Sequence, residues 1–167
     1  QFPDAGYGLC SMAPLIEFPY PALLSPEESY KMNYFKTGIF VRAPLSSIIK
    51  KEAFINIGGF TGKPFLGDFE LWHLLSQKYS MLLMSEGIVW YRFHEKQESK
   101  KMIGNPDNEF EYLLTGESFI KSSMCPLKRK DKEKVLNQYK RRKAQFFLST
   151  LKHHSIKKGW EIKRRGN

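Results

Sequence analysis

The 167-residue sequence is poor in cysteine and has no long apolar run. Its two cysteines, Cys10 and Cys125, are far apart and form no CxxC pair, which predicts two reduced thiols of a cytoplasmic protein. The longest apolar runs, such as "MLLM" and "IVWY", are the size of a strand and fall short of the roughly 20 residues that a membrane-spanning helix needs. The chain begins at Gln1 with no signal-like apolar core, which suggests a processed chain or a piece of a longer protein.

Acidic residues are scarce near the C-terminal end. From Lys128 to Arg165, fifteen Lys or Arg residues stand against three acids, so this segment carries +12 while the whole chain carries +10. The other residues therefore sum to −2, as expected for a near-neutral body that carries a basic segment. We accordingly predict a domain over residues 1–125 and a basic helical segment over residues 126–167.

Prolines crowd the start of the chain, where five of the nine fall within the first 26 residues. This density predicts extended or coil structure up to residue 24, followed by a short helix that Ser25 and Pro26 open. Further along, turn residues and apolar patterns predict strands over 37–42 and 46–49, and a helix over "KKEAFINIGGF" that ends at Gly58.

The second half of the chain continues the alternation of helices and strands. An apolar face at helical spacing predicts a helix over 68–78, and "YSMLLMS" and "GIVWYR" predict two strands joined by a turn. A polar loop follows, and two helices over 107–121 and 130–151 close the chain, with Pro126 between them. This order of elements predicts an α/β or α+β fold.

Asp68 stands in the stretch "GDFELWHLL" and admits three interpretations. An aspartate just before an apolar helical pattern is a preferred N-cap, and it can also serve as a general base. Asp68 and Glu70 also imitate a metal-binding D-x-D pair. Residues two apart on a helix point in different directions, however, so a shared ion is not expected there.

Arg92 and His94 lie two residues apart at the end of the strand predicted from "GIVWYR". Side chains at this spacing face the same side of a strand. A cation and an imidazole on one face suit a phosphate or a phosphate-bound metal. The alternative is a surface histidine beside an arginine that pairs across the sheet, and the two residues alone do not decide between these readings.

Three motifs in order resemble the C-terminal half of the family-2 glycosyltransferases. They are "RAPLSSIIKKEAFINIGGF", "FLGDFELWHLLSQKY" and "GIVWYRFHEKQES", which together cover about residues 38–99. The family has a strand and a "(R/K)(R/K)xxFxxxGGF" helix, then a "GEDxDLWxRL" helix, then a strand that ends in "YRxHxxS". Three motifs at suitable spacing are more specific than any one of them.

The resemblance implies a fold and a reaction. The fold would be GT-A, present here as a partial mixed sheet flanked by helices with a C-terminal helical extension. The reaction would be an inverting transfer of a sugar from a nucleotide-sugar donor to a glycan or lipid-linked acceptor, as in bacterial surface polysaccharide synthesis. Such a transfer needs a carboxylate within reach of the attacking hydroxyl.

The resemblance also implies roles for single residues. Asp68 takes the position of the catalytic base, a role compatible with opening the helix. His94 matches the histidine that helps to hold a divalent ion, Mg²⁺ or Mn²⁺, while Arg92 and Tyr91 would lie beside the diphosphate. Trp72, on the same helix as Asp68, is expected in the core.

Two features depart from the family pattern. The glutamate that usually precedes the base is replaced by Gly67, so an acceptor contact that this glutamate makes would be absent or supplied elsewhere. The family places several βα units and a D-x-D before the matching region, whereas the first 40 residues here hold one aspartate, Asp4, and no Gly-rich βα turn. The chain therefore resembles the acceptor-side half of an enzyme, and we expect no cofactor to be bound by this half alone.

The basic segment over residues 128–165 has three interpretations. It can be a solvated face, a surface for anionic lipid headgroups with Phe146, Phe147 and Trp160 as anchors, or a nucleic-acid surface. No RRM, KH, zinc or helix-turn-helix pattern supports nucleic acid. The resemblance favours the inner face of a membrane, with electrostatic rather than insertive binding because the apolar stripe is expected to pack on the preceding helix. The alternative function is thus a basic nucleic-acid- or membrane-binding module on an inactive glycosyltransferase-like scaffold.

Overall fold

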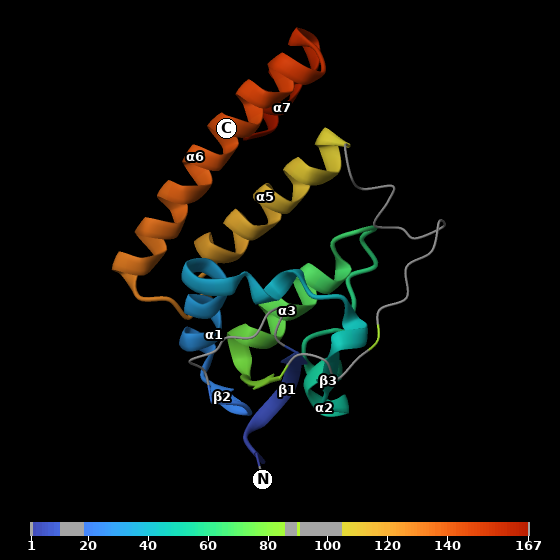
Figure 1. Ribbon diagram of the computed structural model, residues 1–167, viewed down its shortest axis with the longest axis vertical. Coiled ribbons are helices and arrows are strands. Elements are labelled where there is room, and N and C mark those ends of the chain that lie inside the picture. The colour runs from blue at the N-terminus through green and yellow to red at the C-terminus, as the bar shows by residue number, and fades with distance from the viewer. Residues whose placement is uncertain (1, 11–18, 86–89, 91–104, 167) are drawn as a thin grey trace. The chain divides into compact units, whose positions relative to one another are not determined.

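The computed structural model describes residues 2–10, 19–85, 90 and 105–166. The chain divides into two compact units, one over residues 1–93 and one over residues 94–167 (Figure 1). The first unit joins a sheet to helices and the second is helical, so the chain belongs to the α/β class. The regular elements of the first unit are β1 (Ala5–Cys10), β2 (Ala22–Leu24), α1 (Pro26–Met32), β3 (Ser47–Ile49), α2 (Lys51–Asn56), α3 (Gly67–Lys78) and β4 (Ser80–Met84).

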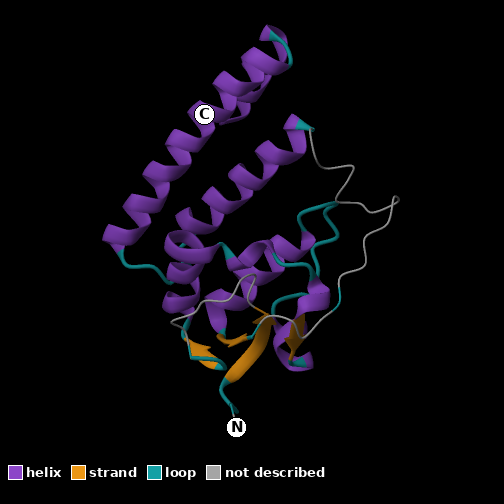
Figure 2. Cartoon of the chain, in the orientation of Figure 1, coloured by secondary structure: helices purple, strands orange, loops and turns teal. Residues whose placement is uncertain are grey.

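The described strands, orange in Figure 2, form one mixed sheet. Their order in the sheet is β2-β4-β1-β3. β1 and β4 run parallel with Tyr7 beside Met81 and Leu9 beside Leu83, while β2 and β3 join the two sides antiparallel. These four side chains are at most 2% exposed, because α1 and α3 cover their face of the sheet. The alternation along each strand therefore places the core between this face and the two helices.

The sequence predicted extended or coil structure up to residue 24 and assigned no strand there, whereas Ala5–Cys10 and Ala22–Leu24 are strands of the sheet. The prolines flank the stretch "AGYGLC" without interrupting it, so its N–H groups remain free to pair. Both neighbours of β1 supply partners, β3 on one side and β4 on the other. A high density of prolines nearby thus did not prevent a central strand.

The predicted strand over 37–42 was wrong. Asn33–Thr37 is a π-helical turn, Gly38 adopts left-handed backbone angles with φ 63°, and a 3-10 turn follows at Ile39–Val41. The backbone N–H of Phe40 donates to Asn33 Oδ1 at 2.9 Å, which closes this turn locally. Ile39 and Phe40 are fully buried, so these apolar residues are part of the core although they do not form a strand.

Several local predictions were confirmed. α1 begins with a capping box, in which Ser25 Oγ accepts from the backbone N–H of Glu28 and the Glu28 carboxylate accepts from the backbone N–H of Ser25. A second 3-10 turn at Pro44–Ser46 leads into β3. α2 ends before Gly58 and Gly59, both at positive φ, as the glycine pair predicted.

The second unit contains α5 (Pro106–Lys121), α6 (Arg129–His153) and α7 (Ile156–Gly166). The sequence predicted two closing helices, and the third was missed because only His154 and Ser155 separate α7 from α6. The three helices pack against one another (Figure 1). α5 thus belongs to the same unit as the basic helices, whereas the sequence placed residues 107–121 with the preceding domain. None of the helices that the structure describes is long and apolar enough to cross a membrane.

Candidate functional site at the start of helix α3

Asp68 is the second residue of α3 and lies in its first turn. The N-cap is Leu66, which makes no side-chain capping bond, so the prediction that Asp68 caps the helix was wrong. The Asp68 carboxylate instead accepts the backbone N–H of Phe69 at 2.8 Å. The predicted position at a helix N-terminus is nevertheless confirmed.

Burial raises the pKa of the Asp68 carboxyl above its usual range. Hydrogen bonds from the backbone N–H groups of Phe69 and Asp68 act in the opposite direction, and a helix N-terminus favours a carboxylate as well. The desolvation is the larger effect, so the pKa still rises. A carboxylate whose pKa is moved toward neutrality accepts a proton more readily than an ordinary surface aspartate.

The Glu70 carboxylate makes polar contacts that Asp68 does not share. It accepts the Thr61 hydroxyl and pairs with Lys63 Nζ at 2.6 Å, and the Glu70 side chain is only 5% exposed. Asp68 and Glu70 therefore do not converge on one ion, as their spacing predicted. Within the described part of the chain, no group of three His, Cys, Asp or Glu residues could hold a metal.

The loop before α3 is held in an unusual backbone conformation. Phe65 has φ 62°, a left-handed value that costs a non-glycine residue about 1–3 kcal/mol. The bonds from Thr61 and Lys63 to Glu70 tie this loop to the helix that follows it. Backbone strain of this kind is concentrated at functional sites, and here it stands three residues before Asp68.

Gly67, which replaces the glutamate of the family pattern, is not required by the backbone. It lies inside the helix without a positive φ, and a Cβ built on it would meet Phe60 Cδ1 at 3.7 Å, an ordinary contact. An alanine would therefore fit, so the glycine reflects neither a tight turn nor a close approach.

The inner face of α3 fixes the helix on the sheet. Trp72 is fully buried, stacks on Tyr7 with ring centroids 6.1 Å apart, and donates its indole N–H to the Arg42 carbonyl at 2.7 Å. One turn further along, the Tyr7 hydroxyl bonds to Ser76. The prediction that Trp72 belongs to the core is confirmed, and these contacts set where Asp68 stands.

His73 is a buried titratable residue that the sequence did not single out. It is fully buried, and its ring makes edge contacts with Tyr30, Phe40 and Phe69. Its Nδ1 lies 2.7 Å from the Phe69 carbonyl and donates to it, which leaves Nε2 to accept the Tyr34 hydroxyl at 2.7 Å. Burial lowers the pKa of His73 to about 4, so it is neutral near pH 7. No signal in the sequence separates it from the apolar residues of the same helix face.

An apolar pocket of about 180 Å³ lies on the opposite face of the sheet and does not include Asp68 in its lining. Gly6 and Gly8 form its floor beside Ile48, Leu82 and Met84. It is therefore separate from the site at the start of α3.

The other predicted site residues, Tyr91, Arg92 and His94, lie outside the described residues, as does most of the strand predicted over 87–92. No protein-family model, curated protein or solved structure matches this chain.

Proposed function

We propose that this chain is the acceptor-side part of an inverting glycosyltransferase of family 2, on a GT-A scaffold, and that Asp68 is its general base. The observation that carries the proposal is the environment of Asp68: a half-buried carboxyl in the first turn of a helix, whose raised pKa comes from burial. Within the described residues it bonds to the backbone of its own helix and to no cation, in contrast to Glu70. The three ordered sequence motifs supply the assignment to this family.

In this proposal Asp68 takes the proton of the acceptor hydroxyl while the hydroxyl oxygen attacks the anomeric carbon of the donor. The bond from that carbon to the diphosphate oxygen breaks on the opposite side, which inverts the configuration. A carboxylate with a raised pKa suits this step, because the proton moves to it without a large free-energy cost. The backbone N–H of Phe69, held at 2.8 Å, orients the carboxylate.

The resemblance also implies a nucleotide-sugar and a divalent ion, Mg²⁺ or Mn²⁺, which would neutralise the departing diphosphate. The carboxylates of Asp68 and Glu70 do not fit an ion between them, because Glu70 is engaged by Thr61 and Lys63. We therefore assign no ion to this pair. His94 remains the proposed ligand of the ion, and Arg92 and Tyr91 remain the proposed residues beside the diphosphate.

The decisive experiment is the substitution Asp68→Asn in a protein that joins this chain to a nucleotide-binding half. Transfer to a glycan or lipid-linked acceptor should fall by roughly 10²–10⁴-fold, the usual contribution of a general base, with donor affinity unchanged. The variant should fold at least as stably as the wild type, because burial disfavours the charged form that the asparagine removes. Near-normal turnover would refute the assignment.

Glu70→Gln is the matched control, since it neutralises an acid two residues away. This change weakens the contact with Lys63, so the free energy of unfolding should fall by about 1 kcal/mol. The loss of transfer should be much smaller than in Asp68→Asn. If both variants lost transfer equally, Asp68 would have no distinct role.

The alternative function, a binding module on an inactive scaffold, is favoured by one observation: long basic side chains remain exposed along α6. Retained binding to an anionic surface, combined with no transfer from any donor, would support this alternative over the enzyme.

A further inference from the structure

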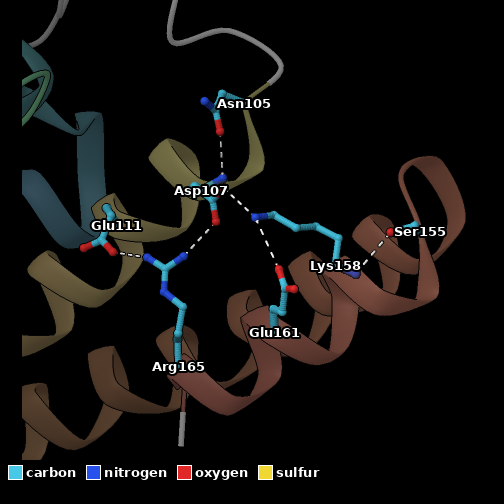
Figure 3. A network of polar contacts seen from close by, with 7 residues as sticks. All are labelled: Asn105, Asp107, Glu111, Ser155, Lys158, Glu161 and Arg165. Carbon is cyan, nitrogen blue, oxygen red and sulfur yellow. Dashed lines mark hydrogen bonds and ion pairs between the residues drawn. The ribbon is translucent and has the colours of Figure 1, made fainter.

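Several cations of the second unit form ion pairs with acids of neighbouring helices. Lys158 and Arg165 on α7 reach Asp107 at 2.5 and 2.8 Å, and Arg165 also pairs with Glu111 (Figure 3). These pairs fasten α7 to the first turns of α5.

α6 is fastened to α5 in a similar way. Lys143 pairs with Glu117 at 2.8 Å and donates to the Gly166 carbonyl at the same distance. Phe146 also stacks on Phe110 with centroids 5.5 Å apart. One of the expected membrane anchors is therefore used inside the unit.

Other cations lie on the outer face of α6. Seven residues recur every three or four positions along this face, which places them on one line of the helix, and all seven are exposed. At 1.5 Å per residue the line is about 33 Å long. It contains four cations and no acid, and one of the four, Lys134, pairs with Asp131 of the same helix at 3.7 Å. We call it the outer stripe; its members are Lys130, Lys134, Asn137, Arg141, Gln145, Leu148 and Lys152.

Large apolar side chains are exposed where α6 turns into α7. Leu148 is 61% exposed, Ile156 71% and Trp160 49%. Trp160 contacts Phe147 of α6 with ring centroids 6.0 Å apart, and Lys163 Nζ lies 4.6 Å from the Trp160 ring. We call Leu148, Ile156 and Trp160 the apolar tip. Cations border it at Lys152, Lys157 and Lys163.

We propose that the outer stripe and the apolar tip together dock this unit on an anionic membrane surface, with the stripe along the headgroups and the tip in the interface. The proposal does not depend on transferase activity, because it uses only residues of α6 and α7. The sequence predicted purely electrostatic binding, because the apolar residues of the helix were expected to be packed. Phe146 is packed in this way, but Leu148, Ile156 and Trp160 are exposed, so the proposal adds insertion of apolar side chains.

The apolar tip favours a membrane over nucleic acid. A line of cations alone attracts either polyanion, and Trp160 can stack on a base. Leu148 and Ile156, in contrast, have no flat face for stacking and gain free energy by leaving water for a lipid interface. Tryptophan beside lysine is also the composition found at membrane interfaces.

The first experiment measures binding of the full chain to vesicles by flotation. Vesicles of equimolar phosphatidylcholine and phosphatidylglycerol should bind the chain at low salt, and pure phosphatidylcholine should not. Binding should weaken as ionic strength rises. The triple variant Lys130→Gln, Arg141→Gln and Lys152→Gln should bind roughly 100-fold more weakly, because each cation at an anionic surface contributes about a fivefold factor.

The matched control removes three exposed lysines from the first unit, by Lys36→Gln, Lys51→Gln and Lys78→Gln. It changes the net charge equally and should bind nearly as the wild type does. Equal losses in both triple variants would show that only net charge matters and would overturn the outer stripe as a docking surface. Binding of the chain to an RNA homopolymer but not to the anionic vesicles would overturn the membrane proposal in favour of a nucleic-acid surface.

A second experiment tests the apolar tip. In a Trp90→Phe background, the remaining tryptophans are the fully buried Trp72 and the exposed Trp160, so an emission change reports Trp160. Anionic vesicles should shift this emission to the blue, and acyl-brominated lipids should quench it. Further substitution of Trp160→Ala should remove both effects while low-salt flotation persists. Unchanged Trp160 emission on bound vesicles would overturn the insertion of the tip.

Discussion

Two titratable side chains on one helix, Asp68 and His73, have pKa values that burial moves in opposite directions. Burial raises the pKa of Asp68 and lowers that of His73 to about 4. The physical cause is the same, because leaving water disfavours whichever form carries the charge. For Asp68 this creates a candidate base, whereas His73 is enclosed by aromatic rings and satisfied at both nitrogens, so its role is to support the helix.

The buried histidine predicts how stability depends on pH. Below the unfolded pKa of 6.5 the unfolded chain binds a proton at this position, and the folded chain does not until about pH 4. The stability due to neutral His73 is therefore fully present above pH 6.5 and is lost as the pH falls toward 4, by about 3 kcal/mol in total. Urea unfolding at several pH values would measure this loss.

The variant His73→Asn isolates the effect, since Asp68 and the other carboxyls titrate in both proteins. Its unfolding free energy should be lower near neutral pH and should vary less between pH 4 and 6.5 than that of the wild type. His153→Asn, at an exposed histidine at the end of α6, controls for the loss of a histidine and should unfold near neutral pH with the free energy of the wild type. An unchanged slope in His73→Asn would mean that the folded chain accommodates the charged imidazole.

At the scale of elements, α6 and α7 approach closely because α7 has a glycine, Gly159, at their contact. A Cβ built on Gly159 would lie 2.5 Å from Leu151 Cδ2 and 3.5 Å from Phe147 Cε2. Gly159 is buried within α7, where glycine is otherwise a poor choice for a helix. The contact between the two helices therefore explains a residue that local propensity disfavours.

Gly159→Ala should destabilise the second unit although alanine is the better helix former. The gain in helix propensity is about 1 kcal/mol, and crowding against a packed side chain costs about 1–3 kcal/mol, so we expect a net loss of about 1 kcal/mol. Thermal unfolding followed by circular dichroism would measure it. Gly67→Ala, where the nearest atom is 3.7 Å away, is the matched control and should be neutral or stabilising. A Gly159→Ala protein as stable as the wild type would show that α7 can move away from α6 without cost.

At the scale of the whole molecule, the chain combines a near-neutral α/β unit with a basic helical unit. The opening 40 residues hold no Gly-rich βα turn, and the carboxylates of Asp68 and Glu70 have separate partners. The proposed function assigns this chain to the acceptor side of the enzyme.

This interpretation predicts that the 167-residue chain binds nucleotide-sugars weakly. Titration calorimetry with a panel of nucleotide-sugars and Mn²⁺ should give little heat beyond that of Mn²⁺ alone. Micromolar affinity for any member of the panel would mean that phosphate-binding elements are present in this chain and that its assignment to the acceptor side is wrong.

Features with local causes could be predicted from the sequence. The capping box at Ser25 and Glu28, the glycine pair after α2 and the apolar period of α3 each depend on residues within a few positions. The same holds for the ends of α5 and α6, which the sequence placed within one or two residues. The place of Asp68 in the first turn of α3 was predicted in this way too, because the start of a helix is a local feature.

Features that depend on distant partners were decided by the tertiary structure. β1 is a strand because β3 and β4 supply its hydrogen bonds, and residues 37–42 turn inward because the core takes Ile39 and Phe40. The raised pKa of Asp68 comes from desolvation by surrounding residues that its sequence neighbours do not specify. The charge of Arg165 is paired with Asp107, 58 positions earlier, although both Arg165 and Arg141 are exposed. The sequence alone determines which side chains are charged and which are apolar. The tertiary structure decides which of them are exposed to water, because burial depends on the whole fold.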